Sequence, residues 1–160
     1  MLNCTLLCVG SLKEAYLRSA SEEYSRRLTR FCRLRIVEAE EERLPAAPSP
    51  AQIQQGLRAE GRRLLAMTPT GAAGIALCIE GTLFSSEKLA QTIEKWTVEG
   101  AGHMAFYIGG SYGLSEEVKE ASRLRLSMSP MTFPHQLARV MVLEQIYRAM
   151  QIRSGGKYHK

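Results

Sequence analysis

The sequence predicts an α/β domain in which a mainly parallel sheet carries helices on both faces. Short apolar runs alternate with longer amphipathic segments along all 160 residues, which is the order of parallel strands joined by helices. The run at residues 104–108 stops at the glycine-rich residues 109–113, and Ser115 then offers an N-cap. A strand, a glycine turn and a helix start commonly form a ligand crevice at the carboxyl end of a parallel strand. With no internal repeat and no second boundary, residues 1–160 are predicted to form a single domain.

The chain begins with a short apolar run, residues 3–9, which ends at Gly10 and predicts the first strand. Apolar residues then recur at every fourth position, which predicts an amphipathic helix with polar residues opposite. This apolar stripe consists of Leu12, Tyr16, Ala20, Tyr24 and Leu28. Residues 34–37 predict a second strand.

Residues 40–50 are first acidic and then rich in proline. Proline removes backbone donors, so we expect an exposed loop here. The end of the loop carries a helix start signal, with Ser49 as the N-cap, Pro50 at the first helical position and Gln52 completing a capping box. A helix is therefore predicted over residues 50–67.

The second half of the chain continues the same alternation. Apolar runs predict strands, and the segments that follow serine or proline predict helices. The predicted elements are a strand at 74–79 that ends at Glu80 and Gly81, a helix at 85–98, a strand at 104–108, a short helix at 116–121, a strand at 123–128 and a helix at 134–152.

The last predicted helix is apolar around much of its circumference, whereas a surface helix buries a single stripe. Its apolar members are Leu137, Val140, Met141, Val142, Leu143, Ile146, Tyr147 and Met150. Such a helix needs a second apolar surface, which favours a subunit interface and a homodimer. Burial inside one core is the alternative.

Basic residues form two groups in a chain of net charge +5. One group lies near the end of the first helix, and the other lies after His135, where Glu144 is the one acid. The first group is Arg26, Arg27, Arg30, Arg33 and Arg35, and the second is Arg139, Arg148, Arg153, Lys157 and Lys160. Basic clusters favour a polyanionic partner such as RNA, although the first group is equally consistent with a solvated surface. All sixteen acids are glutamate, which excludes mechanisms that require an aspartate.

The cysteines and the hydropathy indicate a soluble cytoplasmic protein. Cys4, Cys8, Cys32 and Cys78 show no C-x-x-C spacing and no histidine neighbours, so we expect free thiols and no metal site. No apolar run approaches the ~20 residues that cross a bilayer, and the N-terminus lacks a signal-peptide pattern. We therefore expect no membrane partner.

The glycine turn matches neither of two common nucleotide motifs. The G-x-G-x-x-G pattern lacks its first glycine here and lies two-thirds along the chain, and the P-loop pattern is absent. Three loops at strand carboxyl ends are instead expected to share one pocket. They are Glu80 and Gly81, residues 109–113 and residues 128–133. The last loop suits an adenine and a thioether.

Two sets of motifs and the tail form a distinctive pattern. The first set is Ile108-Gly109-Gly110 with Gly113-Leu114, and the second is Met131-Thr132-Phe133-Pro134-His135 with Arg139-Val140, Glu144-Gln145 and Tyr147-Arg148-Ala149. The tail contributes Tyr158-His159. With these motifs the chain resembles the ribosomal RNA large subunit methyltransferase H family of the SPOUT superfamily, the trefoil-knotted methyltransferases. The resemblance covers nearly the whole chain.

This resemblance implies an α/β-knot homodimer that binds S-adenosylmethionine as its methyl donor, without a metal. It implies methylation of N3 of a pseudouridine in large-subunit (23S) ribosomal RNA, on the assembled ribosome. The implied donor contacts are Leu77, Gly109, Met128, Ser129, Pro130, Met131, Thr132 and Phe133. Cys78 follows Leu77 where the family often has an aspartate, so this chain lacks a carboxylate there.

On the acceptor side, the resemblance favours His159, Tyr158 and Arg139 as catalytic residues, with Arg153 and Lys157 holding RNA phosphates. From composition alone, a histidine in a glycine-hinged tail is more often a disordered end or a remnant of cloning, and it is the resemblance that favours a catalytic role. Two other functions remain open: a non-enzymatic ribosome-binding or assembly factor, and a SPOUT methyltransferase that acts on transfer RNA.

Overall fold

The computed structural model describes all residues from Met1 to Lys160. It contains five strands and five helices in alternation. In chain order they are β1 (Leu2–Val9), α1 (Ala15–Leu28), β2 (Cys32–Ala39), α2 (Pro50–Ala66), β3 (Ala73–Leu83), α3 (Ser86–Val98), β4 (His103–Ile108), α4 (Glu116–Ala121), β5 (Leu124–Ser127) and α5 (His135–Arg153). Every predicted element is present.

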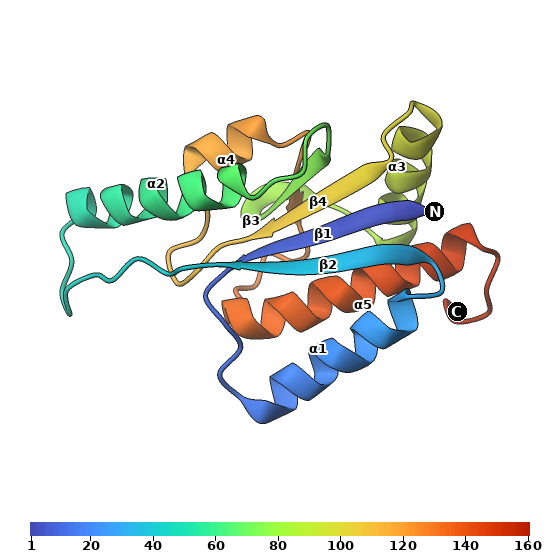
Figure 1. Cartoon of the computed structure of the whole chain (residues 1–160), viewed down its shortest axis with the longest axis horizontal. Coiled ribbons are helices and arrows are strands. Elements are labelled where there is room, and N and C mark those ends of the chain that lie inside the picture. The colour runs from blue at the N-terminus through green and yellow to red at the C-terminus, as the bar shows by residue number, and fades with distance from the viewer.

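The strands form one sheet in the order β2-β1-β4-β3-β5, and every pair is parallel. All the carboxyl ends therefore lie along one edge, as Figure 1 shows. The predicted mainly parallel sheet is confirmed. Because β3 lies between β4 and β5, the loops after β3, β4 and β5 are neighbours in space, although the sequence separates them.

Helices cover both faces of the sheet, as predicted (Figure 1). On one face, α1, α3 and α5 pack on the larger core, which contains Leu6, Phe106 and Ile146. On the other face, α2 and α4 pack on a smaller core around Leu64 and Tyr107. Both cores use β1 and β4, whose consecutive side chains point to opposite faces. The two central strands are consequently apolar along almost their whole length.

Three helix starts rest on serine caps that the sequence predicts. Ser49 and Gln52 form a complete capping box at the start of α2. Ser85 accepts a hydrogen bond from the Lys88 backbone, and Ser115 accepts one from the Val118 backbone. These caps fix where α3 and α4 begin, directly after the segments that end at the carboxyl edge of the sheet.

Two predicted details are wrong. The stripe on α1 does not include Tyr16, whose side chain is 69% exposed; the helix instead buries Leu17, Ser21 and Leu28. The error arose because a four-residue step drifts around a helix of 3.6 residues per turn. The second error concerns β3, which does not end at Glu80 and Gly81 but continues to Leu83, with an irregularity in its pairing with β5.

The four cysteines are free thiols, as predicted; three are buried and Cys78 is half-buried. No helix combines the length and hydropathy that crossing a membrane requires. No group of three or more histidine, cysteine or acidic side chains is arranged to hold a metal ion.

Candidate functional site

A cleft of about 760 Å³ opens at the carboxyl edge of the sheet, where the ends of β3, β4 and β5 converge. It is lined by the three segments that the sequence expects to share a pocket. Seven of the predicted donor contacts line it: Leu77, Gly109, Met128, Ser129, Met131, Thr132 and Phe133. Pro130 belongs to the same loop but is exposed and does not line the cleft.

The glycine turn after β4 is closed by its own backbone. Gly110 and Gly113 form an isolated bridge, and Gly113 has a φ of 85°, a left-handed conformation that favours glycine. A β-carbon on Gly109 would lie 2.1 Å from the carbonyl oxygen of Gly113. Gly109 is therefore required by the turn itself.

Two basic side chains that the sequence does not assign to the donor line the same cleft. Lys119 of α4 pairs with Glu80, and also with Glu116 at 3.4 Å. The hydrogen bond from Lys119 holds the pKa of Glu80 below its usual value. His135 begins α5 without capping it, and burial lowers the pKa of its imidazole. Nothing in the sequence distinguishes Lys119 from an ordinary helix lysine.

Arg139, predicted to be catalytic, lies inside the protein with a side chain only 2% exposed. Its guanidinium pairs with Glu38 of β2 and donates to the backbone oxygen of Gly10 at 2.8 Å, while Nε has no partner. A side chain enclosed in this way ties α5 to the ends of β1 and β2. Its position argues against contact with a substrate and for a role in an internal ion pair. The sequence could not predict this pair, because Glu38 lies far from Arg139 along the chain.

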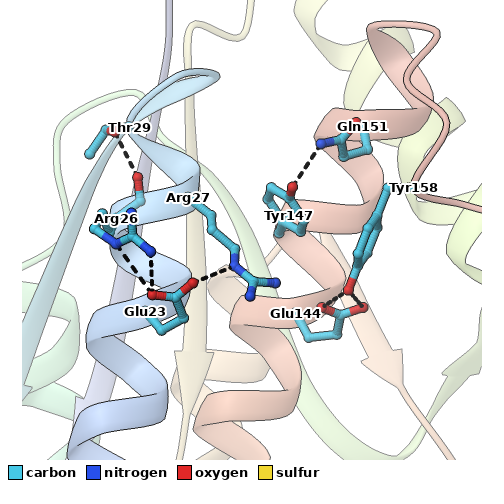
Figure 2. Close-up of polar contacts among 8 residues, drawn as sticks. All are labelled: Glu23, Arg26, Arg27, Thr29, Glu144, Tyr147, Gln151 and Tyr158. Carbon is cyan, nitrogen blue, oxygen red and sulfur yellow. Dashed lines mark hydrogen bonds and ion pairs between the residues drawn. The ribbon is translucent and has the colours of Figure 1, made fainter.

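The C-terminal tail folds back on α5, as Figure 2 shows for Tyr158. The Tyr158 hydroxyl donates to both carboxylate oxygens of Glu144, at 3.0 and 3.2 Å. Its ring meets the Tyr147 ring edge-on, with centroids 4.9 Å apart, and the Arg148 guanidinium lies 4.7 Å from its centroid. The two glycines before Lys157 thus return the chain to the helix, where the sequence suggests a flexible end.

His159 is held through both of its ring nitrogens. Nε2 lies 2.8 Å from Glu87, in the first turn of α3, and Nδ1 lies 3.2 Å from Nη1 of Arg148. A guanidinium can only donate, so Nδ1 accepts and Nε2 carries the hydrogen that faces Glu87. Neither His159 nor Tyr158 lines the cleft.

The two predicted phosphate contacts, Arg153 and Lys157, differ in solvent exposure and in ion pairing. Arg153 donates to Glu94 of α3 at 2.6 Å, and only 18% of its side chain is exposed. Lys157 is exposed and forms no ion pair. In the first basic group, Arg26 and Arg27 both pair with Glu23 (Figure 2). The exposed members without an ion pair are Arg30, which follows the end of α1, and Arg33 and Arg35, which lie on the edge strand β2.

Comparison with known proteins places this architecture in one class. The family profile described as "Predicted SPOUT methyltransferase" matches residues 2–159. The fold is also similar to two solved structures of low sequence identity. One is a probable methylase family protein from Haemophilus influenzae Rd KW20, with a TM-score of 0.50 and 13% identity, covering 99% of this chain and 70% of the other. The second is a probable methyltransferase from Bordetella pertussis Tohama I, with a TM-score of 0.55 and 14% identity, covering 93% and 96%.

Full-length relatives narrow the class. Proteins named Ribosomal RNA large subunit methyltransferase H are 46% identical in Clostridium novyi (strain NT) and 45% identical in Bifidobacterium animalis subsp. lactis (strain AD011), in each case over 99% of this chain and 100% of the relative. The relative of that name in Streptococcus gordonii is 46% identical over 97% of this chain and 98% of its own. The chain therefore belongs to the SPOUT methyltransferases and, within them, to the ribosomal RNA large subunit methyltransferase H family.

Proposed function

We propose that this protein transfers a methyl group from S-adenosylmethionine to N3 of a pseudouridine in large-subunit ribosomal RNA, on the assembled ribosome in the cytoplasm. The observation that carries the proposal is the convergence of three loops on one cleft, together with full-length similarity to relatives named as ribosomal RNA methyltransferases. The trefoil knot of the SPOUT proteins belongs to the same proposal.

The cleft suits a donor of this size and charge. Its volume of about 760 Å³ lies within the range of about 300–1,000 Å³ usual for small-molecule sites. A sulfonium donor is cationic, so an unpaired positive charge in the cleft would oppose binding. Lys119 is neutralised by Glu80, and the lowered pKa of His135 leaves its ring neutral at pH 7.

The donor, when bound, supplies an activated methyl group: the N3–C bond forms as the C–S bond breaks, the electron pair goes to sulfur and the N3 proton goes to a base. The remaining work of the protein is to align the two reactants. Residues 109–113 and 128–133 provide a backbone-lined wall for the donor, and the acceptor is positioned from the other side.

His159 is the proposed base, with Tyr158 beside it. In the folded tail its Nδ1 lone pair is occupied by Arg148, so it accepts a proton only after Arg148 moves away. Glu144 holds Nε and Nη2 of Arg148, at 2.9 and 2.6 Å, and Nη1 is the nitrogen that faces His159; for Nη1, an RNA phosphate is a stronger partner than a neutral imidazole is. We therefore assign Arg148 the role of responding to the RNA, with exposed Lys157 adding electrostatic attraction. Arg139 has a structural role in this proposal, because it is buried in an ion pair with Glu38. Arg153 contributes less to RNA binding than Lys157, because it is paired with Glu94.

The homodimer belongs to the same proposal. Leu137 on α5 is 40% exposed, and the neighbouring Val140 and Met141 remain partly exposed in the single chain. Sedimentation should give twice 17.8 kDa. Leu137→Arg should produce a folded monomer, because the substituted side chain is already at the surface. A wild-type monomer that methylates RNA would contradict the dimer.

Binding of S-adenosylmethionine distinguishes the proposed enzyme from a non-enzymatic assembly factor. The RNA that becomes methylated distinguishes it from a transfer RNA methyltransferase. Calorimetry should detect one S-adenosylmethionine site per chain. Methylation should then occur on large subunits or whole 70S ribosomes and not on transfer RNA. Ribosome binding without donor binding would favour the assembly factor, and methylation of transfer RNA alone would favour the third function.

A further inference from the structure

The amino-terminal half of β2 carries two exposed arginines on the face of the sheet opposite α5. Arg33 and Arg35 alternate with Leu34 and Ile36, which pack against the larger core. Val37, the next residue on the arginine side, packs against the smaller core. Because consecutive side chains of a strand point to opposite faces, Arg33 and Arg35 lie on the α2 side of the sheet.

These arginines lie beyond the part of that face which α2 covers. Leu64 of α2 packs with Val9 and Ala39, at the carboxyl ends of β1 and β2, and Figure 1 shows α2 at that end of the sheet. Arg33 precedes Ala39 by ~20 Å along the strand. Both arginine side chains are consequently open to solvent.

The side chains beside the two arginines are polar and uncharged. The pairing with β1 places Asn3 beside Arg33 and Thr5 beside Arg35, and the pairing with β4 places His103 on the far side of Asn3. The Thr5 hydroxyl lies 2.8 Å from Nε2 of His103. Burial lowers the pKa of His103, so its ring is neutral at pH 7. No carboxylate therefore faces the arginines from the paired positions of the sheet.

The positive charge on this surface is not balanced within the chain. Glu38, the one acid of β2, points to the other face and pairs with Arg139. Arg33 and Arg35 form no ion pair, although they lie only ~6.6 Å apart along the strand and repel each other. Arg30, in the turn that leads into β2, is also exposed and unpaired. Like charges gathered without a counterion gain from an anionic partner.

Protection of the sheet edge is the alternative explanation, because β2 is an edge strand. Charged side chains on an edge prevent strands of other molecules from pairing with it, and lysine is the usual choice. Arginine differs from lysine in its planar guanidinium, which binds a phosphate through two parallel hydrogen bonds. The residue type and the presence of three arginines at one end of the strand favour a phosphate-bearing partner.

We propose that Arg30, Arg33 and Arg35 form a docking surface for RNA phosphates, remote from the cleft where methyl transfer takes place. The proposal rests on the proposed function, which makes ribosomal RNA the polyanionic partner. In the sheet, β1 and β4 separate β2 from β3, so the surface lies ~20 Å or more from the cleft. The dimer proposed through α5 leaves it accessible, because α5 packs on the opposite face.

The distance from the cleft determines what the surface does. RNA held ~20 Å away is a different segment from the one that carries the target nucleotide, and its contacts do not change during methyl transfer. Interactions that are equal in the ground state and in the transition state lower KM and leave kcat unchanged. The surface therefore adds affinity for a large, structured RNA and plays no part in the chemistry.

The first test removes the two charges with Arg33→Gln/Arg35→Gln. Affinity for ribosomes, measured without the donor, should fall at least tenfold (about 1.4 kcal/mol). Two lost phosphate contacts should reduce the slope of log affinity against log salt by about 1.5. In methylation assays KM for ribosomes should rise to a similar extent, while kcat and the affinity for S-adenosylmethionine stay within about twofold.

The matched control is Arg43→Gln/Arg62→Gln, which removes the same two charges from the 40–49 loop and from α2. Arg43 and Arg62 are exposed and form no ion pair, and this variant should bind ribosomes within about twofold of wild type. Arg33→Lys/Arg35→Lys keeps the charge and removes the guanidinium. It should retain the wild-type salt slope and bind with intermediate affinity. Thermal melting and sedimentation check that each variant is folded and not aggregated.

The outcomes are distinct. If the wild-type protein binds ribosomes but transfers no methyl group, the proposed function fails, and the affinities alone still decide the docking surface. Unchanged affinity and salt slope in Arg33→Gln/Arg35→Gln would overturn the surface, and self-association of that variant at unchanged affinity would assign the arginines to edge protection. An equal loss in the control would reduce the effect to net charge. A fall in kcat at constant KM would place the arginines in the chemistry and would also overturn the proposal.

Discussion

The glycine turn and the C-terminal tail are held in place by opposite means. The turn after β4 is shaped by backbone atoms: the Gly110 bridge to Gly113 and the 2.1 Å that would separate a Gly109 β-carbon from a carbonyl. The tail is held by side chains, through Tyr158 on Glu144 and His159 on Glu87 and Arg148. Backbone contacts fix one shape, whereas polar side-chain contacts at a surface can be exchanged for others.

This difference matches the two tasks that we propose for these segments, donor binding for the turn and acceptor chemistry for the tail. The donor is always the same molecule, so a rigid binding surface built from backbone atoms suits it. An RNA acceptor approaches from solvent, and groups that meet it gain from partners they can exchange for phosphate or base. We infer that donor binding depends on steric features of the fold, and that acceptor chemistry depends on contacts the tail makes and releases.

Gly109→Val should have the largest effect, because it breaks the turn. The new side chain would overlap a backbone oxygen that cannot rotate away, so donor affinity should fall ~100-fold or more, about 2.7 kcal/mol. Calorimetry measures the affinity, and circular dichroism checks the fold. Gly110→Ala is the control, since its β-carbon would meet a Val9 methyl at 3.3 Å, and its affinity should change less than about fivefold. A folded Gly109→Val variant that binds normally would remove the steric account of the turn.

Deleting residues 157–160 should distinguish most clearly between the role of the glycine turn in donor binding and the role of the tail in methylation. Donor affinity should stay within about threefold, ~0.6 kcal/mol, because no tail residue lines the cleft. Methylation should fall ~100-fold or more, the scale of losing a positioned acid–base group. Both are measured on the same preparation. Full activity of the truncated protein would move the acceptor chemistry away from the tail.

Tyr158→Phe should have a smaller effect, because it removes one hydrogen bond and keeps the ring on Tyr147. The loss of the bond to Glu144 should lower kcat/KM about three- to tenfold, consistent with ~0.5–1.5 kcal/mol for such a bond. Tyr16→Phe, at a position 69% exposed, is the matched control and should change nothing. Equal behaviour of the two variants would show that the Tyr158–Glu144 contact does not position the tail.

Glu60→Gln, a substitution at a buried residue of α2, should have the smallest effect, and the effect should be on stability. Burial raises the pKa of this carboxyl, whose Oε1 accepts from the Glu42 backbone at 3.2 Å. With a raised folded pKa, the contribution of Glu60 to stability is full below its unfolded pKa and is lost as pH rises through the folded value. Glutamine avoids that loss, so the melting temperature at pH 7 should rise by ~1–3 °C, with no gain at pH 4 or below. A destabilised variant at pH 7 would show that the carboxylate charge is needed.

The sequence predicts the architecture well, because its signals are local. Serine caps, the Ser49–Gln52 capping box and the glycines after β4 act within a few residues, and each is found where predicted. The cleft follows from the same logic, because parallel strands place their carboxyl ends together. The three loops could therefore be grouped from the sequence, whereas the individual donor contacts within them were implied by the resemblance to a known family.

The acceptor side could not be predicted in the same way, because its partners are distant in the chain. Arg139 meets Glu38, and His159 meets Glu87, across separations that periodicity does not encode. The hydrogen bond from Ser86 to Gln145 likewise depends on the packing of α3 against α5. Composition identified the tail as basic and hinged but gave no reason for it to fold back.

The most direct test of the proposed function is the identity of the methylated nucleoside. Purified protein, S-adenosylmethionine carrying a labelled methyl group, and ribosomes that lack the modification would be incubated together, and the RNA would be digested and analysed by mass spectrometry. We predict labelled 3-methylpseudouridine in the large-subunit RNA, with higher yield from whole 70S ribosomes than from naked RNA. Label in any other nucleoside, or none despite donor binding, would contradict the account.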